Sequence, residues 1–171
     1  GACPECTGLG EKMTWDEAKI LPDRNLSFNQ GAFPFFNPDS SWNHAMFEGI
    51  ALANGWTLDT PIKDLSKKQF DSLWFGDMTK NIHWVYKKQS GEGFSEYNRP
   101  WIGILAEMSR RRNEAWGENQ RIRIEEKFMS VCSCPACNGK RLRREALGVT
   151  VGGKNIIDLC SLSVEQSISF F

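Results

Sequence analysis

Cys3-Pro4-Glu5-Cys6-Thr7-Gly8 has a second copy in Cys134-Pro135-Ala136-Cys137-Asn138-Gly139. Each C-P-x-C-x-G knuckle offers two thiolates about one turn apart, and its glycine lets backbone N–H groups face the sulfurs. A structural zinc ion takes four such ligands in a tetrahedron. The sequence therefore predicts one structural zinc site formed by Cys3, Cys6, Cys134 and Cys137, with residues 7–133 as one insertion between the two ligand pairs.

Two other uses of the cysteines compete with this site. A disulfide within each knuckle would close a very short, strained loop, and nothing in the sequence indicates secretion. Cys132 could compete as a ligand, which we do not expect. Cys160 lies in an apolar stretch, where we expect it to be a small buried hydrophobic side chain.

Composition limits the function of the chain. It has 171 residues, of which 40% are hydrophobic and 25% charged, enough for one core on a metal-bound base. The formal net charge is zero, so binding to a nucleic acid would need a local basic patch. No stretch is long and apolar enough to cross a membrane, and we recognise no signal peptide. Six cysteines without a secretory signal indicate a reducing compartment.

Hydrophobic spacing predicts two helices in the first half of the insertion. Apolar residues recur on one helical face over residues 41–53. Ser66 with Gln69 forms a capping box for a second helix, which Gly76 closes. The preceding residues 11–41 are expected to be irregular, with four phenylalanines in the core, namely Phe28, Phe33, Phe35 and Phe36.

Two more helices are expected in the second half of the insertion. Pro100 suits the first turn of a helix. The buried side of that helix would hold four residues, namely Trp101, Leu105, Met108 and Ala115. Gly117 would separate it from another helix over residues 118–129.

Short antiparallel hairpins are expected beside these helices. Apolar and polar residues alternate over residues 82–87, and a turn at residues 90–93 would return the chain along residues 94–98. Gly152-Gly153 predicts a two-residue hairpin between residues 147–151 and 154–158. Ser163 with Gln166 would cap a last helix.

These patterns predict an α+β fold, in which helices and short antiparallel hairpins form an insertion domain on a zinc-stapled base. The expected boundaries are residues 1–10 for the first knuckle, 11–130 for the insertion domain and 131–171 for the second knuckle and the start of the domain that follows it.

The sequence contains no arrangement of residues that would support catalysis. Neither His44 nor His83 has an obvious Cys, Ser or carboxylate partner in the sequence. No G-x-x-x-x-G-K-[ST] loop is present to hold nucleotide phosphates. Four thiolates also leave a zinc ion no open position for a substrate. We therefore expect no enzymatic activity from this chain.

Basic residues on the insertion are candidates for DNA contact. Arg110 and Arg111 share a predicted helix with Glu107 and Glu114, which could pair with them instead. Two lysines at a hairpin tip, Lys87 and Lys88, follow aromatic residues that could stack on unpaired bases but more often belong to a core.

The densest basic group follows the second knuckle and has only Glu145 nearby. It consists of Lys140, Arg141, Arg143 and Arg144. Arginine and backbone N–H groups form a good surface for phosphate contact. Arg141 could instead have a structural role at the metal-bound base.

Both ends of the chain carry motifs that are specific to one family. Residues 1–10 are similar to its G-A-C-P-x-C-x-G-L-G segment, and residues 134–147 to its C-P-x-C-x-G-x-R-L-x-x-E-x-L segment. The match continues through residues 151–156 and the closing Phe170-Phe171. Together these motifs resemble the UvrA family, the damage-recognition ATPase subunits of the bacterial excision-repair nuclease, over essentially the whole chain.

The resemblance implies an insertion domain rooted in the first signature domain. Such a domain would help to clamp duplex DNA around a lesion during nucleotide excision repair, weakly and without reading sequence. ATP and the UvrB partner would belong to parts of the parent outside this sequence. The parent would be a homodimeric protein of the bacterial cytoplasm, without membrane contact.

Two alternatives stay open. The family carries another C-x-x-C pair shortly before the first knuckle, so Cys3 and Cys6 could bind a different zinc ion with that pair. Residues 3–10 also fit the C-x-x-C-x-G-x-G repeat of the DnaJ chaperones, which would make the chain a zinc-stapled protein-binding module without DNA contact. The second knuckle departs from that repeat at Lys140 and Arg141.

Overall fold

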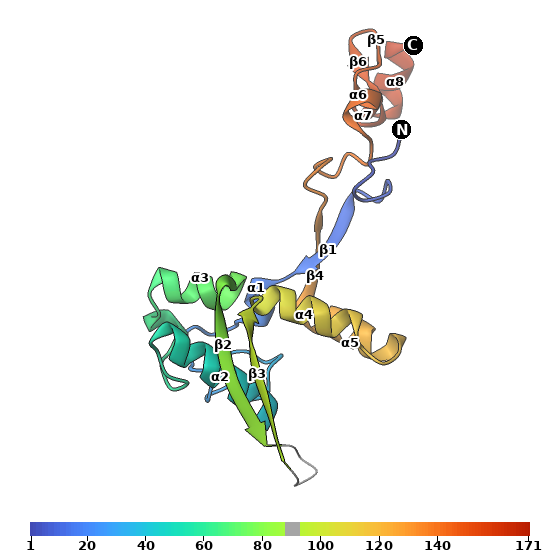
Figure 1. Ribbon diagram of the computed structural model, residues 1–171. Helices are drawn as coiled ribbons and strands as arrows, with labels where there is room; N and C mark the ends of the chain where they lie inside the picture. The colour runs from blue at the N-terminus through green and yellow to red at the C-terminus, as the bar shows by residue number, and fades with distance from the viewer. Residues whose placement is uncertain (88–92) are drawn as a thin grey trace. The chain divides into compact units, whose positions relative to one another are not determined.

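The computed structural model describes residues 1–87 and 93–171, and it consists of two compact units (Figure 1). The central unit comprises Trp15–Met129. The knuckle unit comprises Gly1–Thr14 together with Ser130–Phe171. The chain passes from one unit to the other along two paired strands, β1 (Glu11–Trp15) and β4 (Met129–Ser133).

The central unit combines helices with one long antiparallel hairpin. Its elements are α1 (Glu17–Ile20), α2 (Ser41–Asn54), η1 (Ile62–Asp64), α3 (Lys67–Phe75), β2 (Asp77–Lys87), β3 (Phe94–Trp101), α4 (Ile104–Asn113) and α5 (Glu118–Phe128). Phe47 of α2 lies at the centre of the core and stacks on Phe28 with ring centroids 4.1 Å apart. Phe33 and Phe36 are also buried and pack on Phe47. The predicted phenylalanine anchors are therefore confirmed, with Phe35 packed against the core and partly buried.

Helix α2 packs closely against the β2–β3 hairpin (Figure 1). Gly49 permits this approach, because a Cβ at that position would lie 2.6 Å from the carbonyl oxygen of His83. Ile82 and Trp84 are buried while His83 and Val85 are exposed, as the alternating pattern predicts. Residues 88–92 lie outside the described residues. They include Lys88 and all of the predicted turn at residues 90–93 except Gly93.

The predicted helix boundaries hold where the sequence has a cap. The side chain of Ser66 accepts the N–H of Gln69, and the two residues form the expected capping box of α3. Gly117, with φ of 91°, precedes α5. Because the Ser66 side chain satisfies an unpaired N–H group of the first turn, it fixes where α3 begins. Gly117 makes no such bond and separates α4 from α5.

The helix predicted after Pro100 is present, but its predicted start is wrong. Pro100 and Trp101 belong to strand β3, and α4 begins at Ile104 after Gly103. Proline is tolerated here because the ladder between β2 and β3 is irregular between Asp77 and Asn81, opposite this end of β3. The helix then ends at Asn113, so Ala115 lies beyond it.

Two further predictions need correction within residues 11–41 and 147–160. Residues 11–41 are not wholly irregular, since they contain β1 and a short α1 that Asp16 caps. The hairpin at Gly152-Gly153 is confirmed but short, with strands β5 (Thr150–Val151) and β6 (Lys154–Asn155). Asn155 forms a capping box with Asp158 and so ends the second strand by starting helix α7 (Ile156–Cys160).

The knuckle unit has almost no apolar core. Besides β5, β6 and α7, it contains two short helices, α6 (Arg144–Leu147) and α8 (Val164–Phe170). All residues of this unit are described, and its buried hydrophobic side chains are the four knuckle cysteines. Cys160 is exposed, so the prediction of a buried side chain is wrong, because no residue of α7 is buried. No helix in the described parts of the chain combines the length and apolarity needed to cross a bilayer.

Candidate metal centre and basic surface

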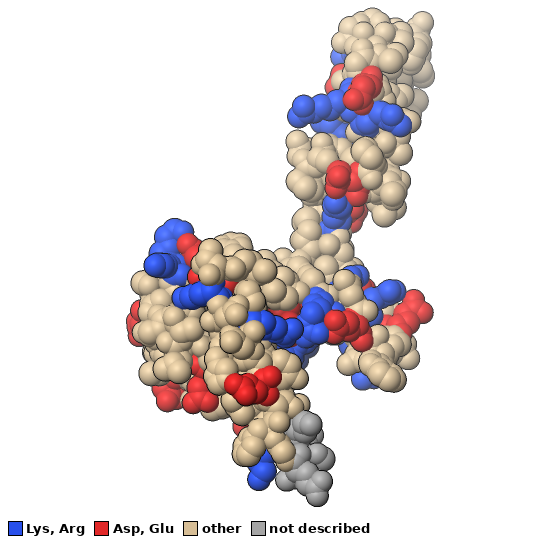
Figure 2. Space-filling model, in the orientation of Figure 1, with Lys and Arg blue, Asp and Glu red and all other residues tan. Residues whose placement is uncertain are grey.

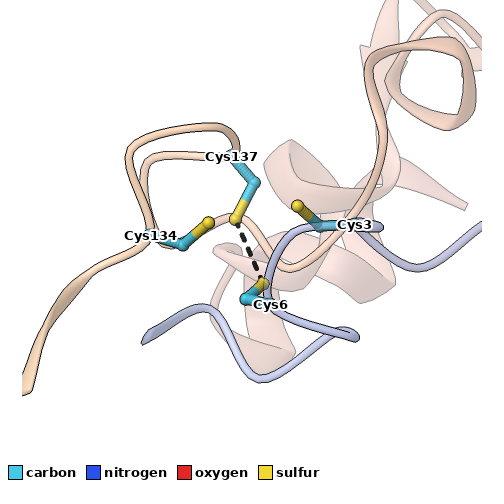
Figure 3. Close-up of side chains that lie close together, drawn as sticks. All are labelled: Cys3, Cys6, Cys134 and Cys137. Atoms are coloured by element: carbon cyan, nitrogen blue, oxygen red, sulfur yellow. Dashed lines mark hydrogen bonds between the residues drawn. The ribbon is translucent and has the colours of Figure 1, made fainter. Parts of the chain in front are cut away.

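Four sulfur atoms converge at the centre of the knuckle unit (Figure 3). The Sγ atoms of Cys3, Cys6, Cys134 and Cys137 all lie within 4.8 Å of one another, and all four residues are buried. The Sγ atoms of Cys6 and Cys137 are 3.7 Å apart. Tetrahedral zinc with Zn–S distances of about 2.3 Å would place its sulfurs about 3.8 Å apart. The donor set and its spacing therefore suit one tetrahedral metal ion.

The two knuckles are related to each other by matched backbone hydrogen bonds. The N–H of Cys3 donates to the carbonyl of Arg141, and the N–H of Cys134 donates to the carbonyl of Gly10, both at 2.8 Å. Within the knuckles, Leu9 N–H donates to the Cys6 carbonyl and Lys140 N–H to the Cys137 carbonyl, both at 2.9 Å. Each knuckle thus closes on the other by the same bonds, which brings together cysteines 131 positions apart.

Backbone N–H groups also face the second sulfur of each knuckle. The N–H of Gly10 donates to Cys6 Sγ at 3.2 Å. Burial raises the pKa of Cys6, but the N–H groups of Gly10 and Gly8 outweigh it and, with neighbouring thiols, lower the pKa to about 7. Burial raises the pKa of Cys137 to about 11, although the Arg141 N–H opposes this. A divalent metal ion bound here would displace the protons of both sulfurs.

The other cysteines do not join the cluster. All six cysteines lie in described parts of the chain and are free thiols, so the alternative of one disulfide per knuckle is not observed. Cys132 is exposed, and its sulfur lies 3.5 Å from Thr14 Oγ1. The structure thus brings together the four predicted ligands and leaves Cys132 and Cys160 outside the group.

The second knuckle carries exposed positive charge that is not held in ion pairs with any described residue. Lys140, Arg141, Arg143 and Arg144 are all exposed. Among the described residues, no side-chain hydrogen bond or ion pair engages any of these four side chains. Figure 2 shows Lys and Arg side chains gathered in a band across the knuckle unit, with acidic side chains among them. This local patch exists although the whole chain has no net charge.

Arg110 and Arg111 lie in a different setting, because both hold a buried carboxylate. Glu107 is 1% exposed and accepts from Arg110 Nη2 at 2.7 Å and from Arg111 Nε at 2.8 Å. Arg110 also pairs with Glu114, and Arg111 donates to Asn43 Oδ1 of α2 at 3.1 Å. Arg111 thereby joins α4 to α2, and the pairing leaves less of the charge of both arginines available for a nucleic acid.

The remaining candidates lie along the β2–β3 hairpin. Lys87 is exposed at the end of β2, while Trp84 is buried and stacks on Tyr97 with ring centroids 5.3 Å apart. His83 pairs with Glu96 on the exposed side, so it has a carboxylate partner that the sequence did not reveal. Trp84 is therefore a core residue rather than a stacking surface.

Sequence reasoning missed the close approach of the Arg141 side chain to Gly10 in the other knuckle. When the knuckles are aligned on their cysteines, Arg141 corresponds to Gly10, and both have positive φ, 66° and 81°. A Cβ on Gly10 would lie 2.9 Å from Arg141 Cγ. An alignment of the two copies within the sequence would have revealed this glycine-for-arginine exchange.

Comparisons with known proteins agree on one family. Residues 16–126 match the family model of the UvrA DNA-binding domain. UvrABC system protein A of Treponema pallidum is 40% identical over 171 residues, which is all of this chain and 18% of that protein. The same-named proteins of Borreliella burgdorferi and Staphylococcus aureus are 39% and 33% identical, again over all of this chain. The chain thus spans 18% of the length of these curated relatives.

A solved structure shares the fold. The crystal structure of UvrA2 from Deinococcus radiodurans aligns with a TM-score of 0.67 at 23% identity, over 99% of this chain and 22% of that chain. The α+β arrangement of helices, short antiparallel sheets and clustered cysteines is therefore confirmed. The DnaJ-like alternative is not favoured, because the UvrABC relatives match the whole chain.

Proposed function

The chain belongs to the UvrA family, and from this membership we propose that it is a DNA-contacting part of a damage-recognition protein of nucleotide excision repair. Within the whole protein it would help to hold duplex DNA around a lesion. The observation that carries this proposal is the unpaired basic group on the second knuckle, which follows residues 16–126, the part that matches the UvrA DNA-binding domain.

The proposed metal is one structural zinc ion bound by the four knuckle cysteines. Four thiolates at this spacing favour zinc and leave no coordination position for a substrate. Zinc would hold the two knuckles together, and the knuckles in turn would present the basic group. The chain itself would perform no hydrolysis, and ATP would act elsewhere in the whole protein.

The whole protein sets the wider context of the proposal. We propose that Trp15–Met129 is the insertion domain and that the knuckle unit is part of the signature domain from which it emerges. The UvrB partner and a second copy of the parent would bind through other parts of the polypeptide. Its place of action would be the bacterial cytoplasm.

Contact with DNA would use phosphates rather than bases. Arginine and lysine side chains bind phosphate oxygens, which carry no direct sequence information. Because the net charge is zero, long-range attraction is weak and the local contacts provide the affinity. The four basic residues of the second knuckle are the leading candidates. Lys87 ranks below them because it is a single basic residue at the end of β2. Arg110 and Arg111 rank below them because both are paired with Glu107.

We expect metal-loaded protein to bind duplex DNA weakly at low salt and without sequence preference. If two or three phosphates are neutralised, a plot of log affinity against log salt should have a slope of about −2 to −3, at about 0.9 per phosphate. Fluorescence anisotropy with damaged and undamaged duplexes of equal length measures both quantities. Replacing Lys140, Arg143 and Arg144 by alanine should remove most of the binding.

A variant with the same charge change provides the control. Lys63, Lys67 and Lys68 are exposed on the central unit, away from the knuckles in sequence. Their joint replacement by alanine should leave the DNA affinity near that of the wild type. Equal losses in both variants would indicate a net-charge effect, and no binding by the wild type at low salt would refute DNA contact by this chain.

A further inference from the structure

We propose that Arg141 is a dedicated phosphate-binding residue, kept at a backbone position that favours glycine because its side chain contacts a DNA phosphodiester there. The inference rests on the proposed function and adds a specific residue, a specific geometry and a cost in stability. Arg141 would thus have a role that its basic neighbours do not share and that is not purely structural.

The backbone conformation of Arg141 is unusual for a residue with a side chain. Among the residues that the structure describes, three non-glycine residues have positive φ, namely Thr7, Asn138 and Arg141. Thr7 and Asn138 occupy the same position in the two knuckles, directly after the second cysteine, so the turn itself requires that conformation. The turn also requires positive φ at the position of Arg141, since its counterpart Gly10 has it too, but there a side chain adds strain that glycine avoids. Strained residues occur preferentially at functional sites.

The first knuckle shows that the turn does not need a side chain at the position of Arg141. Gly10 is its counterpart, with φ of 81°, and it makes the same two backbone contacts. Gly10 N–H faces Cys6 Sγ as Arg141 N–H faces Cys137 Sγ, and each carbonyl accepts the first cysteine of the other knuckle. Glycine would therefore satisfy the metal site at lower strain, which leaves the arginine side chain without a role in the turn.

Gly10 also provides the space that Arg141 uses. A Cβ on Gly10 would lie 2.9 Å from Arg141 Cγ and 3.3 Å from Arg141 Nε, so the arginine side chain crosses the bare glycine backbone. Glycine at both position 10 and position 141 would give two alike knuckles without a guanidinium at this place. The exchange of one glycine for arginine therefore places a single guanidinium against the other knuckle.

Arg141 borders an open hollow of about 270 Å³ in the knuckle unit. Gly10, Gly139 and Ser133 form the small-residue part of its wall, where a ligand can approach the backbone, and Leu9 and Val131 are larger apolar neighbours. No ion pair or side-chain hydrogen bond of Arg141 is found within the described residues. Its donors are therefore available to an anion, and a planar guanidinium matches two oxygens of a phosphate group.

One acidic residue opposes this arrangement. Glu11 lines the same hollow but forms no ion pair with Arg141. Its carboxylate repels an incoming phosphate, which keeps the site weak. Removing this charge should therefore strengthen DNA binding through the same site.

The decisive variant is Arg141→Gly in the metal-loaded chain. It restores the residue that the turn favours, so the thermal unfolding midpoint should stay equal or rise, and the metal content should stay at one ion per chain. Affinity for a duplex of about 30 base pairs at low salt should fall about tenfold, as for the loss of one charge-assisted contact. The salt slope should decrease in magnitude by about 0.9. Glu11→Gln should bind more tightly than the wild type, and Lys68→Ala should bind like it.

The outcomes separate this inference from the proposed function. Wild-type protein that binds no DNA would refute the proposed function and the inference with it. Wild-type binding that Arg141→Gly leaves unchanged would overturn the inference alone. A lower unfolding midpoint or metal loss in Arg141→Gly would show a structural role and overturn it as well. Loss of inorganic phosphate binding in Arg141→Gly, with DNA affinity unchanged, would assign the site to a free anion and overturn the inference.

Discussion

Cys137→Ser is expected to abolish metal binding and unfold the knuckle unit, while the central unit stays folded. The knuckle unit, described throughout, buries no large apolar side chain besides its four cysteines, so the metal would supply most of its stability. Structural zinc in small domains contributes an apparent free energy of about 10–16 kcal/mol. The central unit has its own aromatic core around Phe47 and should lose little.

Hydrogen exchange measured on peptides tests this expectation region by region. Protection should vanish over residues 1–14 and 130–171 and persist over the core helices of the central unit. Cys160→Ser is the matched control, because Cys160 is exposed and lies outside the cluster. A uniform loss of protection in Cys137→Ser would contradict the division into a metal-dependent and a metal-independent unit.

Glu107→Ala should destabilise the central unit by about 3 kcal/mol. Breaking a buried ion pair typically costs about 3–5 kcal/mol, and we take the lower end because both arginines are partly exposed. Glu107 itself is 1% exposed and binds Arg110 and Arg111 together. Its loss also weakens the link from Arg111 to Asn43 on α2. Urea denaturation followed by tryptophan fluorescence measures the change.

The matched control for Glu107 is Glu114→Ala. Glu114 pairs with the same Arg110, but its side chain is 60% exposed, so its loss should cost under about 1 kcal/mol. Equal effects of the two substitutions would show that burial of Glu107 contributes nothing.

Acid should remove the contribution of Glu107. Burial raises its pKa, but Arg110 and Arg111 outweigh burial and hold the pKa below its ordinary value of 4.5. A lowered pKa stabilises the folded state above the ordinary value and loses that effect as the pH falls through the folded pKa. The stability difference between wild type and Glu107→Ala should therefore shrink below about pH 4.5.

Local signals in the sequence predicted those parts of the fold that short-range chemistry determines. Ser66 and Gln69 fixed the start of α3, and alternating residues identified β2. Pro100 led to a wrong helix start, because it lies in β3 opposite an irregular part of β2. That position depends on strand register, which residue propensities do not predict. Cys160 misled for a similar reason, since apolar neighbours in sequence do not ensure burial in so small a unit.

The candidate site was predictable to a similar extent. The repeated knuckle motif predicted four sulfurs that the structure brings together. The pairing of Arg110 and Arg111 with Glu107 was weighed from their spacing, but the burial of Glu107 could not be read from it. The contact between Gly10 and Arg141 joins residues 131 positions apart and depends on the fold of both knuckles.

The central claim is that metal-joined knuckles build the DNA-contacting surface. The most direct test compares the DNA affinity of one sample before chelation, after chelation and after zinc is restored, at constant low salt. Metal content is measured on each portion. We predict that binding is largely lost with the metal and returns with one zinc ion per chain. Unchanged affinity in a sample shown to be free of metal would contradict the claim.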